Sequence, residues 1–525
     1  MRARSLWMAL LCVTSSALGD AGYGDGSPVV ARHPLAVRIE ALAVEAATAA
    51  HRTPPIADAR LAHALELLAP RILDGQPPAD ALTSEALWLS GIVEPLPYLV
   101  VLTVSNGGDD DVLGRLRTIV APLLVDGRYS RVAAVVRDLD PAHRQVLLAL
   151  QESSIHVERV PRQAPVGATL PIAGTITPAY ARAEVFATAP DGRNTMRIPV
   201  SGEAQRFSSG FVCATRGRWQ LEVVADGRLG STVLANFPVY CGERAPTALP
   251  GESSVASAPF VEPWSDAAEA ERTVLAAINR DRAAAGLAPV VRDAALQQVA
   301  RFHAGEMRDG NYVGHNSPTS GTPSDRVKRA GIVTPRLLLE NVAVGSGPEQ
   351  VEKSFMDSPA HRANLLNGEV DRVGVGAAVG GGVDAGGREL YVTELFARFA
   401  EHTDDAGATA RLRARSEETR RAAHLPSLVS DPELERAAAA IARGLAEKTL
   451  ASDGAGAIVK ATSAHLGERY SSLRTILADA AEVGDLKLDL LAEATFTHAG
   501  IAAAVATTGD PRVHCVVLLA SERRR

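Results

Sequence analysis

Three residues in the middle of the chain have side chains that could do chemistry together. They are His315 in the sequence GHNSP, Glu340 in LLLENVA and His361 in SPAHRANLL. Two imidazoles and a carboxylate can hold a divalent metal ion, with the carboxylate as a ligand or as the hydrogen-bond partner of a ligand. The same set can act as general acid and base, with Glu340 orienting a histidine. The sequence therefore predicts a site here and leaves its chemistry open.

His361 is predicted to lie at the start of a short helix. Ser358 suits the N-cap and Pro359 the first helical position, which puts His361 at the third. The positive end of the helix dipole favours a neutral imidazole, which is the form that binds a metal. Zinc or another divalent metal is thus the cofactor that such a site would take, with one coordination position left open for water or substrate.

A structural role is the main alternative for these residues. His315 and Glu340 could form a buried hydrogen-bonded pair that holds a loop, and His361 could tie the start of its helix to a sheet. A hydrolase that uses the same three residues as its catalytic groups is the other alternative. The residue types do not choose among a ligand-binding, a structural and a catalytic site.

Other polar residues nearby have simpler explanations. His303 lies on the apolar stripe of a predicted helix and is expected in the core. Ser317 follows His315 in a turn without the strained G-x-S-x-G elbow, so we do not expect a nucleophile there. Glu394 lies on an otherwise apolar side of a predicted strand and is a weaker candidate for the wall of the site.

Helices and a hairpin are predicted to position the central residues. Asp266 caps a first helix and Asp293 a second, and Gly347 precedes a third. The runs RVGVGAAV and ELYVTELFARF then alternate as the two strands of a hairpin. The side chains of the site therefore come from loops and element ends around a small sheet.

Two other segments resemble this central one. The motif DAAL, which begins at Asp293, has counterparts in DARL at Asp58 and DPEL at Asp431, each with an Asp suited to cap a helix. Strand-like runs follow at similar places in all three segments. An internal repeat of this kind indicates three related domains.

The outer segments lack the polar groups. Alignment puts Val100 at the place of Glu340 and Ala121 at the place of His361 in the first segment. In the third segment it puts Leu486 at the place of His361. We therefore expect the outer copies to keep the packing and to have lost the site.

Residues 162–242 have a different character. Short alternating runs such as TLPIAGTI and WQLEVVAD, separated by turn signals, predict an all-β sandwich of immunoglobulin-like type. Cys213 and Cys241 lie in this segment and are expected to form a disulfide bond. Cys515, in the apolar run HCVVLLA, is expected to be a buried free thiol.

Length and composition limit the remaining possibilities. A chain of 525 residues is too long for one hydrophobic core. The net charge is −7 without a long basic block, so nothing favours nucleic acid as a partner. The first 19 residues have the basic start, apolar run and small residues of a signal peptide, and no later run predicts a transmembrane segment. A secreted protein, extracellular or periplasmic, is expected, where disulfides persist.

The central motifs GHNSP, ENVA, SPAHRANLL, VGVG and YVTELF, in this order, resemble the CAP superfamily of cysteine-rich secretory, antigen 5 and pathogenesis-related proteins, in its bacterial secreted branch. The resemblance implies a three-layer α-β-α sandwich and a cleft with two His and two Glu. His315 matches the first His and Glu340 the first Glu. Ser358 stands at the place of the second Glu and Leu390 at that of the second His, so a two-histidine metal site here would depend on His361.

The predicted fold is an α+β multidomain chain: an intact CAP-like domain flanked by two degenerate CAP-like copies, plus the all-β sandwich. Its expected parts are a signal peptide (1–19), a degenerate domain (36–160), the sandwich (162–242), a linker (243–265), the intact domain (266–399) and a degenerate domain (410–521). The resemblance implies binding of a small apolar ligand, a lipid or a divalent metal, or of an envelope component. A hydrolase of peptide or envelope polymer and a structural or adhesive envelope protein are the alternatives.

Overall fold

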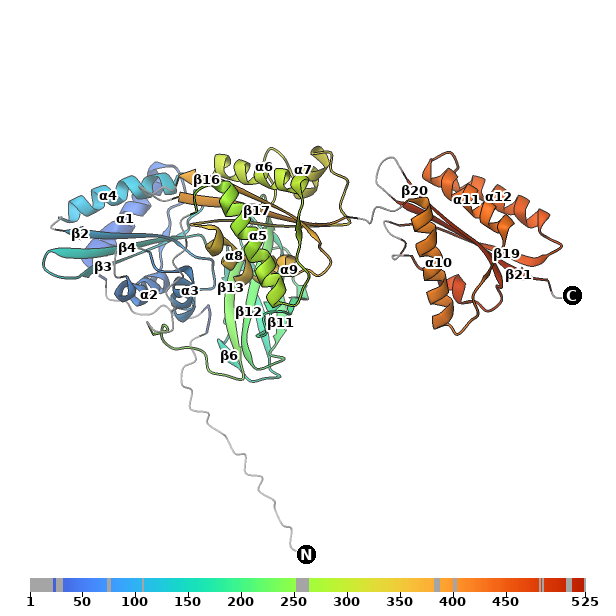
Figure 1. Ribbon diagram of the computed structural model, residues 1–525. Helices are drawn as coiled ribbons and strands as arrows, with labels where there is room; N and C mark the ends of the chain where they lie inside the picture. The colour runs from blue at the N-terminus through green and yellow to red at the C-terminus, as the bar shows by residue number, and fades with distance from the viewer. Residues whose placement is uncertain are drawn as a thin grey trace, which may run out of the picture.

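The computed structural model describes residues 22–24, 32–72, 77–105, 108–251, 264–381, 388–399, 404–480, 483, 486–506 and 512–523. These residues form three α/β lobes and one domain made of two sheets (Figure 1). The predicted signal peptide and residues 252–263 of the predicted linker lie outside the described residues. No helix among the described residues is long and apolar enough to cross a bilayer.

The central lobe is a four-stranded sheet with helices on both faces. Its strands have the order β14-β16-β17-β15, so β15 is an edge strand. Helices α5 and α8 share an apolar core with one face of β16 and β17, and α6 packs on the opposite face. The elements are α5 (Ala267–Ala284), β14 (Val291–Arg292), α6 (Ala294–Gly310), α7 (Pro323–Arg329), β15 (Leu337–Gly345), α8 (Pro348–Asp357), α9 (Pro359–Leu365), β16 (Arg372–Gly381) and β17 (Arg388–Arg398).

Glycines on β16 allow α6 to lie close to the sheet. A Cβ atom added to Gly374 would lie 2.2 Å from the carbonyl carbon of Leu296, and one added to Gly376 would lie 2.1 Å from that of Ala300. No side chain fits at such distances, so the VGVG run is a packing requirement of the helix on the sheet.

The first lobe has the same strand order, β1-β3-β4-β2, with its first pair parallel and the others antiparallel. Asp58 caps α2 as Asp293 caps α6: each carboxylate accepts hydrogen bonds from the backbone amides two and three residues further along the chain. The elements are α1 (Pro34–Ala49), β1 (Ile56–Ala57), α2 (Ala59–Leu68), the 3₁₀-helix η1 (Ala69–Arg71), α3 (Asp80–Leu89), β2 (Tyr98–Ser105), α4 (Asp109–Leu123), β3 (Arg131–Asp138) and β4 (His143–Gln151).

The third lobe has the order β18-β20-β21-β19, and Asp431 caps its helix α11 in the same way. Its first helix begins at Asp405, so the boundary predicted at residue 410 is wrong, because the polar start of this helix reads as a linker. The free Cys515 is buried, as expected. The elements are α10 (Asp405–Ala422), β18 (Val429–Ser430), α11 (Pro432–Ala446), α12 (Ser452–His465), β19 (Tyr470–Ala480), the 3₁₀-helix η3 (Asp489–Ala492), β20 (His498–Val505) and β21 (Val513–Glu522).

The pairing register corrects one predicted correspondence between the lobes. Glu340 on β15 lies opposite Leu395, which in turn lies opposite Gly374. The parallel strand pairs β14–β16 and β1–β3 align Gly374 with Ala133 of the first lobe. Ala133 lies opposite Ala149, which in turn lies opposite Leu99. Leu99, and not Val100, therefore occupies the place of Glu340. A shift of one residue moves a side chain to the other face of a sheet, so sequence alignment alone misplaced it.

Between the first and central lobes lies a domain of two sheets that share one core, which we call the two-sheet domain. Cys213 and Cys241 form a disulfide bond, as predicted. Strand β5 pairs with β7, so the domain begins before the predicted residue 162, because the run IHV is too short to signal a strand. Its strands are β5 (Ile155–Val157), β6 (Gln163–Ala164), β7 (Thr169–Ile176), β8 (Ala181–Thr188), β9 (Thr195–Ile198), β10 (Val200–Ser201), β11 (Arg206–Val212), β12 (Gly217–Gly227) and β13 (Gly230–Cys241).

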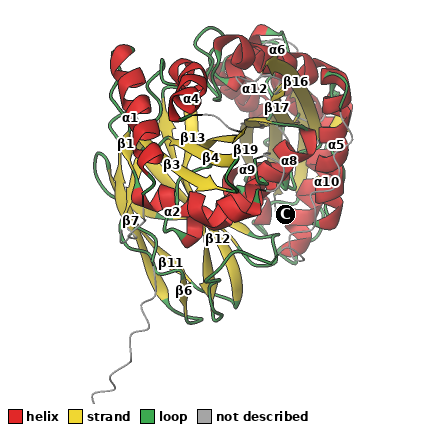
Figure 2. Cartoon of the chain, turned by 90° about the vertical axis from the view of Figure 1, so that its left-hand side faces the viewer, coloured by secondary structure: helices red, strands yellow, loops and turns green. Residues whose placement is uncertain are grey.

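The two-sheet domain contacts both neighbouring lobes. The Trp88 indole of the first lobe donates to the carbonyl of Asn236, at 2.9 Å. On the other side, Arg362 of the central lobe donates to the carbonyl of Gly192, at 2.6 Å. Figure 2 shows β11 and β12 extending below the helices of the lobes, and Figure 1 shows the third lobe to one side.

Candidate functional site

The structure brings His315, Glu340 and His361 together at the edge of the central sheet. His315 lies in the loop between α6 and α7, Glu340 on the edge strand β15, and His361 in the first turn of α9. The Nδ1 atom of His315 is 3.0 Å from Oε1 of Glu340, and the centroids of the two imidazole rings are 6.5 Å apart. The three predicted site residues are therefore neighbours in space.

Glu340 is a buried carboxylate held by two partners. Its Oε2 accepts a hydrogen bond of 2.5 Å from Arg326, which is itself buried, and its Oε1 faces His315. Burial, the largest influence, raises the pKa of Glu340, but the hydrogen bond from His315 and the charge of Arg326 outweigh it and leave the pKa below its usual range. The carboxylate is ionised and can only accept, so His315 donates from Nδ1.

His361 is held through its Nδ1 atom as well. This atom lies 2.8 Å from the hydroxyl oxygen of Ser358, and the ring packs against Phe355 with a centroid distance of 5.2 Å. Burial and the nearby His315 lower the pKa of His361 to about 3. The imidazole is therefore neutral at pH values well above 3.

Ser358 is the N-cap residue of α9, and His361 is the third residue of that helix, as predicted. The side chain of Ser358 does not cap its own helix, however. Its hydroxyl donates to Oε1 of Glu222 in the two-sheet domain, at 2.6 Å, and the backbone amide of Ala360 donates to Oε2 of Glu222, at 2.7 Å. A carboxylate from another domain thus satisfies the start of α9.

Glu222 is the site residue that the sequence reasoning missed. It is fully buried on β12, and burial raises its pKa to about 7, although the hydrogen bonds from Ser358 and Ala360 lower it in part. The signal that could have found it is a single carboxylate inside the apolar run WQLEVVAD. A charged residue in a buried strand calls for a partner.

The turn between β12 and β13 also contacts the site. The amide of Asn316 donates to the carbonyl of Leu229, at 2.8 Å. Gly230 has a φ of +96°, and a Cβ atom there would lie 2.9 Å from the Cβ atom of His315. The site therefore lies at the boundary between the central lobe and the two-sheet domain, and both contribute to its walls.

His303 is fully buried and its Nε2 lies 2.9 Å from the carbonyl oxygen of Gly314, which agrees with its predicted core position. The Ser317 hydroxyl donates to Glu306, as does that of Ser320, so this turn is a hydrogen-bonded support for the His315 loop. A nucleophilic role for Ser317 has no support in these contacts.

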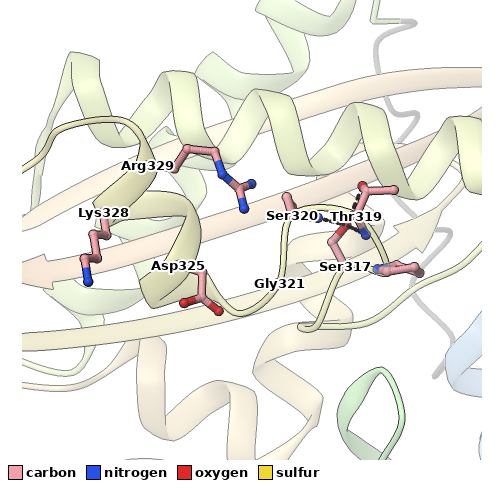
Figure 3. Close-up of a pocket in the computed structure, with 8 residues that line it drawn as sticks. Ser317, Thr319, Ser320, Gly321, Asp325, Lys328 and Arg329 are labelled. Carbon is pink, nitrogen blue, oxygen red and sulfur yellow. Dashed lines mark hydrogen bonds between the residues drawn. The ribbon is translucent and has the colours of Figure 1, made fainter.

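An open hollow of about 460 Å³ lies beside this turn. Figure 3 shows hydroxyl side chains gathered on one side of it and charged side chains of α7 on the other. Such a lining is polar, whereas pockets for apolar ligands are lined mainly by apolar and aromatic side chains. The residues around it are Ser317, Pro318, Thr319, Ser320, Gly321, Asp325, Lys328 and Arg329.

Glu394 lies on the other side of the sheet from Glu340. It pairs with Asn341, the neighbour of Glu340 on β15, and neighbouring residues of a strand point to opposite faces. The carboxyl accepts from Asn341 at 3.0 Å and lies near the buried Glu352 of α8. Its predicted place in the wall of the site is therefore wrong: it belongs to a buried carboxyl pair beneath α8.

This pair predicts a dependence of stability on pH. Burial raises the pKa of Glu352, and repulsion from Glu394 raises it further; burial raises the pKa of Glu394 also. The folded state therefore binds protons more tightly than the unfolded state, and stability is lost as the pH rises above roughly 4.5. Glu394→Gln is expected to exceed the parent in stability by about 1–3 kcal/mol at pH 8 and to match it near pH 4.5.

Urea denaturation at both pH values checks this expectation. Glu349→Gln, which replaces an exposed carboxylate of α8, is the control and should leave both midpoints unchanged. A Glu394→Gln variant that is less stable than the parent at pH 8 would contradict a raised carboxyl pKa.

The surroundings of the two imidazoles limit which side chains could serve as metal ligands. Within the parts of the chain that the structure describes, no three His, Cys, Asp or Glu side chains are grouped to hold an ion. Glu340 is occupied by Arg326 and His315, so it orients a histidine instead of serving as a ligand. Each imidazole has its Nδ1 engaged and its Nε2 left for a ligand.

Comparisons with known proteins match the central lobe. Residues 275–396 match the family described as "Cysteine-rich secretory protein family", abbreviated CAP. The uncharacterized protein YkwD of Bacillus subtilis (strain 168) is 36% identical over 141 residues, which make up 27% of this chain and 52% of YkwD. The uncharacterized membrane protein YlbC of the same organism is 34% identical over 108 residues, or 20% of this chain and 31% of YlbC. The chain thus spans about half of YkwD and a third of YlbC.

Two solved structures are also similar to the chain. An outer surface protein from Borrelia burgdorferi is 21% identical, with a TM-score of 0.23, and the match covers 26% of this chain and 96% of that protein. An extracellular protein containing a SCP domain from Bacillus anthracis str. Ames is 17% identical, also with a TM-score of 0.23, and the match covers 56% of this chain and 93% of that protein.

Proposed function

Because the central lobe belongs to the cysteine-rich secretory protein (CAP) family, we propose that this chain is a binding protein whose His315 and His361 hold a divalent metal ion, zinc in the first place. The observation that carries the proposal is the way in which the two imidazoles are held. Glu340 and Ser358 engage the two Nδ1 atoms and leave the two Nε2 atoms for an ion. Hydrogen-bonded support of this kind orients metal-bound histidines in proteins.

The charge state of the site supports the same proposal. A metal competes with protons for imidazole nitrogen, and the lowered pKa of His361 removes that competition for one of the two rings. The ionised Glu340 accepts the Nδ1 proton of His315 and so makes its Nε2 a stronger electron-pair donor to a metal ion. A bound zinc ion would supply a Lewis acid with open positions for a further ligand.

The place of action is part of the proposal. The Cys213–Cys241 disulfide is a feature of proteins that work in an oxidising compartment. We place the protein outside the cytoplasm, in the cell envelope or beyond it. The outer lobes, which share the strand order of the central lobe and have Leu99 and Thr475 at the place of Glu340, are proposed to be degenerate CAP-like copies that act as scaffolds.

A hydrolase of peptide or envelope polymer is the second candidate. It is favoured by the pairing of His315 with a buried carboxylate, because the imidazole side chain is 20% exposed and could act as a general base on a bound substrate. Apolar ligands and lipids have less support at this place, since hydroxyl and charged groups line the neighbouring hollow.

Zinc titration by calorimetry tests the proposed function on the full chain. The parent is expected to bind one ion, and His315→Ala and His361→Ala are each expected to weaken binding by more than about 100-fold, because loss of a ligand costs more than loss of its hydrogen-bond partner. His156→Ala removes an exposed histidine of β5 and serves as the control. Equal binding in all four proteins would exclude this site. Absence of binding, together with polymer hydrolysis that His315→Ala abolishes, would favour the hydrolase instead.

A further inference from the structure

We infer that Glu222 of the two-sheet domain is a positioning residue of the central site, because its carboxylate fixes, through the hydroxyl of Ser358, the tautomer of His361 that leaves Nε2 free for a ligand. This inference rests on the proposed function, since it says that a second domain sets the tautomer of one of the two metal-binding imidazoles. The site is then complete only when the two domains are docked together.

The contacts run in one line across the domain boundary. Glu222 on β12 accepts from the Ser358 hydroxyl at 2.6 Å, and the oxygen of that hydroxyl lies 2.8 Å from Nδ1 of His361. The other oxygen of Glu222 accepts from the amide of Ala360 at 2.7 Å, which fixes the carboxylate against the start of α9. Glu222 is fully buried and Ser358 nearly so. Few alternative partners are therefore open to this hydroxyl.

Counting protons along this line gives the tautomer. Ser358 has one hydroxyl proton, and an ionised Glu222 has none to donate, so the proton of Ser358 lies toward Glu222. The contact between Ser358 and His361 then needs a proton from the imidazole, which must be the one on Nδ1. A neutral imidazole with its proton on Nδ1 has its lone pair on Nε2, the atom that a metal ion would bind.

A neutral amide at residue 222 reverses the order of donors. In Glu222→Gln the amide NH₂ can donate to the Ser358 oxygen, while the carbonyl of the new side chain accepts from Ala360. The Ser358 proton is then free to point at Nδ1 of His361, and the imidazole proton moves to Nε2. The substitution keeps the size and both hydrogen bonds of the buried side chain, so it isolates the charge from the packing.

Nitrogen NMR of the full chain, labelled with ¹⁵N-histidine, tests the inference without a metal. The ¹⁵N shifts of a protonated and of a bare ring nitrogen are well separated, and His361→Gln assigns the signals. At pH 8, above the pKa of about 7 of Glu222, the parent is expected to show a protonated Nδ1 and a bare Nε2. Glu222→Gln is expected to show the reverse, and to bind zinc about 10- to 100-fold more weakly.

Two further variants serve as controls for the effect of Glu222→Gln. Arg193→Ala removes another contact between the two domains, the hydrogen bond of 3.2 Å to the carbonyl of Ala284, and should keep the tautomer of the parent. Ser358→Ala interrupts the line from the side of α9. Its ring signals are expected at averaged positions, because both tautomers then become populated, and this variant decides the question if Glu222→Gln fails to fold.

The outcomes separate this inference from the proposed function. A parent that shows the proton on Nε2, or a Glu222→Gln variant that keeps it on Nδ1, would overturn the role of Glu222. A parent with the expected tautomer that binds no zinc would leave the role of Glu222 intact and contradict the proposed metal site.

Discussion

Replacing Arg282 with methionine is expected to lower the free energy of unfolding of the central lobe by at least about 3 kcal/mol. Arg282 is 1% exposed at the end of α5. Its guanidinium donates to four backbone carbonyl groups, those of Ala288, Leu365, Asn367 and Val370, at 2.8–3.4 Å. Methionine fills the space but leaves these buried acceptors without a donor, which is the costly case.

Two of those carbonyls lie at the end of α9 and just beyond it, so Arg282 also holds the helix that carries His361. The third lobe offers a matched variant. Arg420, at the end of α10, donates in the same pattern to Pro426, Leu491, Glu493 and Phe496. Arg420→Met is expected to destabilise the third lobe and to leave the proposed zinc binding of the central lobe unchanged.

Thermal unfolding followed by calorimetry checks both variants, with Arg272→Met, an exposed position on α5, as the control. Arg282→Met should lower the unfolding temperature of the central lobe, and Arg420→Met that of the third lobe. Arg272→Met should leave both temperatures close to those of the parent. If Arg282→Met melts like Arg272→Met, the four carbonyl groups do not depend on this side chain.

Arg326→Met is expected to have an effect of similar size, about 3–5 kcal/mol, because it removes one partner of a buried ion pair. Glu340 would then be left as a buried charge with only His315 beside it. Arg326 also donates to the carbonyl groups of His315 and Gly321, so its loss loosens the loop of the first imidazole.

A second substitution distinguishes the contribution of the ion pair to stability from that of these loop contacts. In Arg326→Met/Glu340→Leu both charges are gone, and part of the lost stability is expected to return, because an apolar pair of similar volume can replace a buried ion pair. Urea denaturation measures both variants, and Arg329→Met, an exposed arginine of α7, is the control. A double variant as unstable as the single one would mean that the carbonyl contacts of Arg326, and not its pairing with Glu340, account for the loss.

The local part of the site could be predicted from the sequence. Ser358 and Pro359 signal the start of α9 and so fix the place of His361, and the three Asp caps signal the helices that follow the short strands. These signals work because capping depends on residues within one turn. The predicted disulfide bond of Cys213 was confirmed for a similar reason, since the β-rich segment holds only one other cysteine.

The long-range part could not be predicted. Arg326 and Arg282 look like ordinary helix arginines, and only the folded chain shows that both are buried with carbonyl or carboxylate partners. Glu222 lies 136 residues before Ser358, in a segment for which the sequence predicts only an all-β sandwich and a disulfide bond. The place of Leu99 shows the same limit, because strand register depends on pairing partners and not on local composition.

The measurement that tests the central claim most directly is anomalous diffraction at the zinc absorption edge, on crystals of the full chain grown with zinc. We predict one strong peak between His315 and His361, within bonding distance, about 2.0–2.1 Å, of both Nε2 atoms. The absence of a peak there while zinc is bound at other residues, or a peak bonded to Nδ1 of either ring, would contradict the two-histidine site.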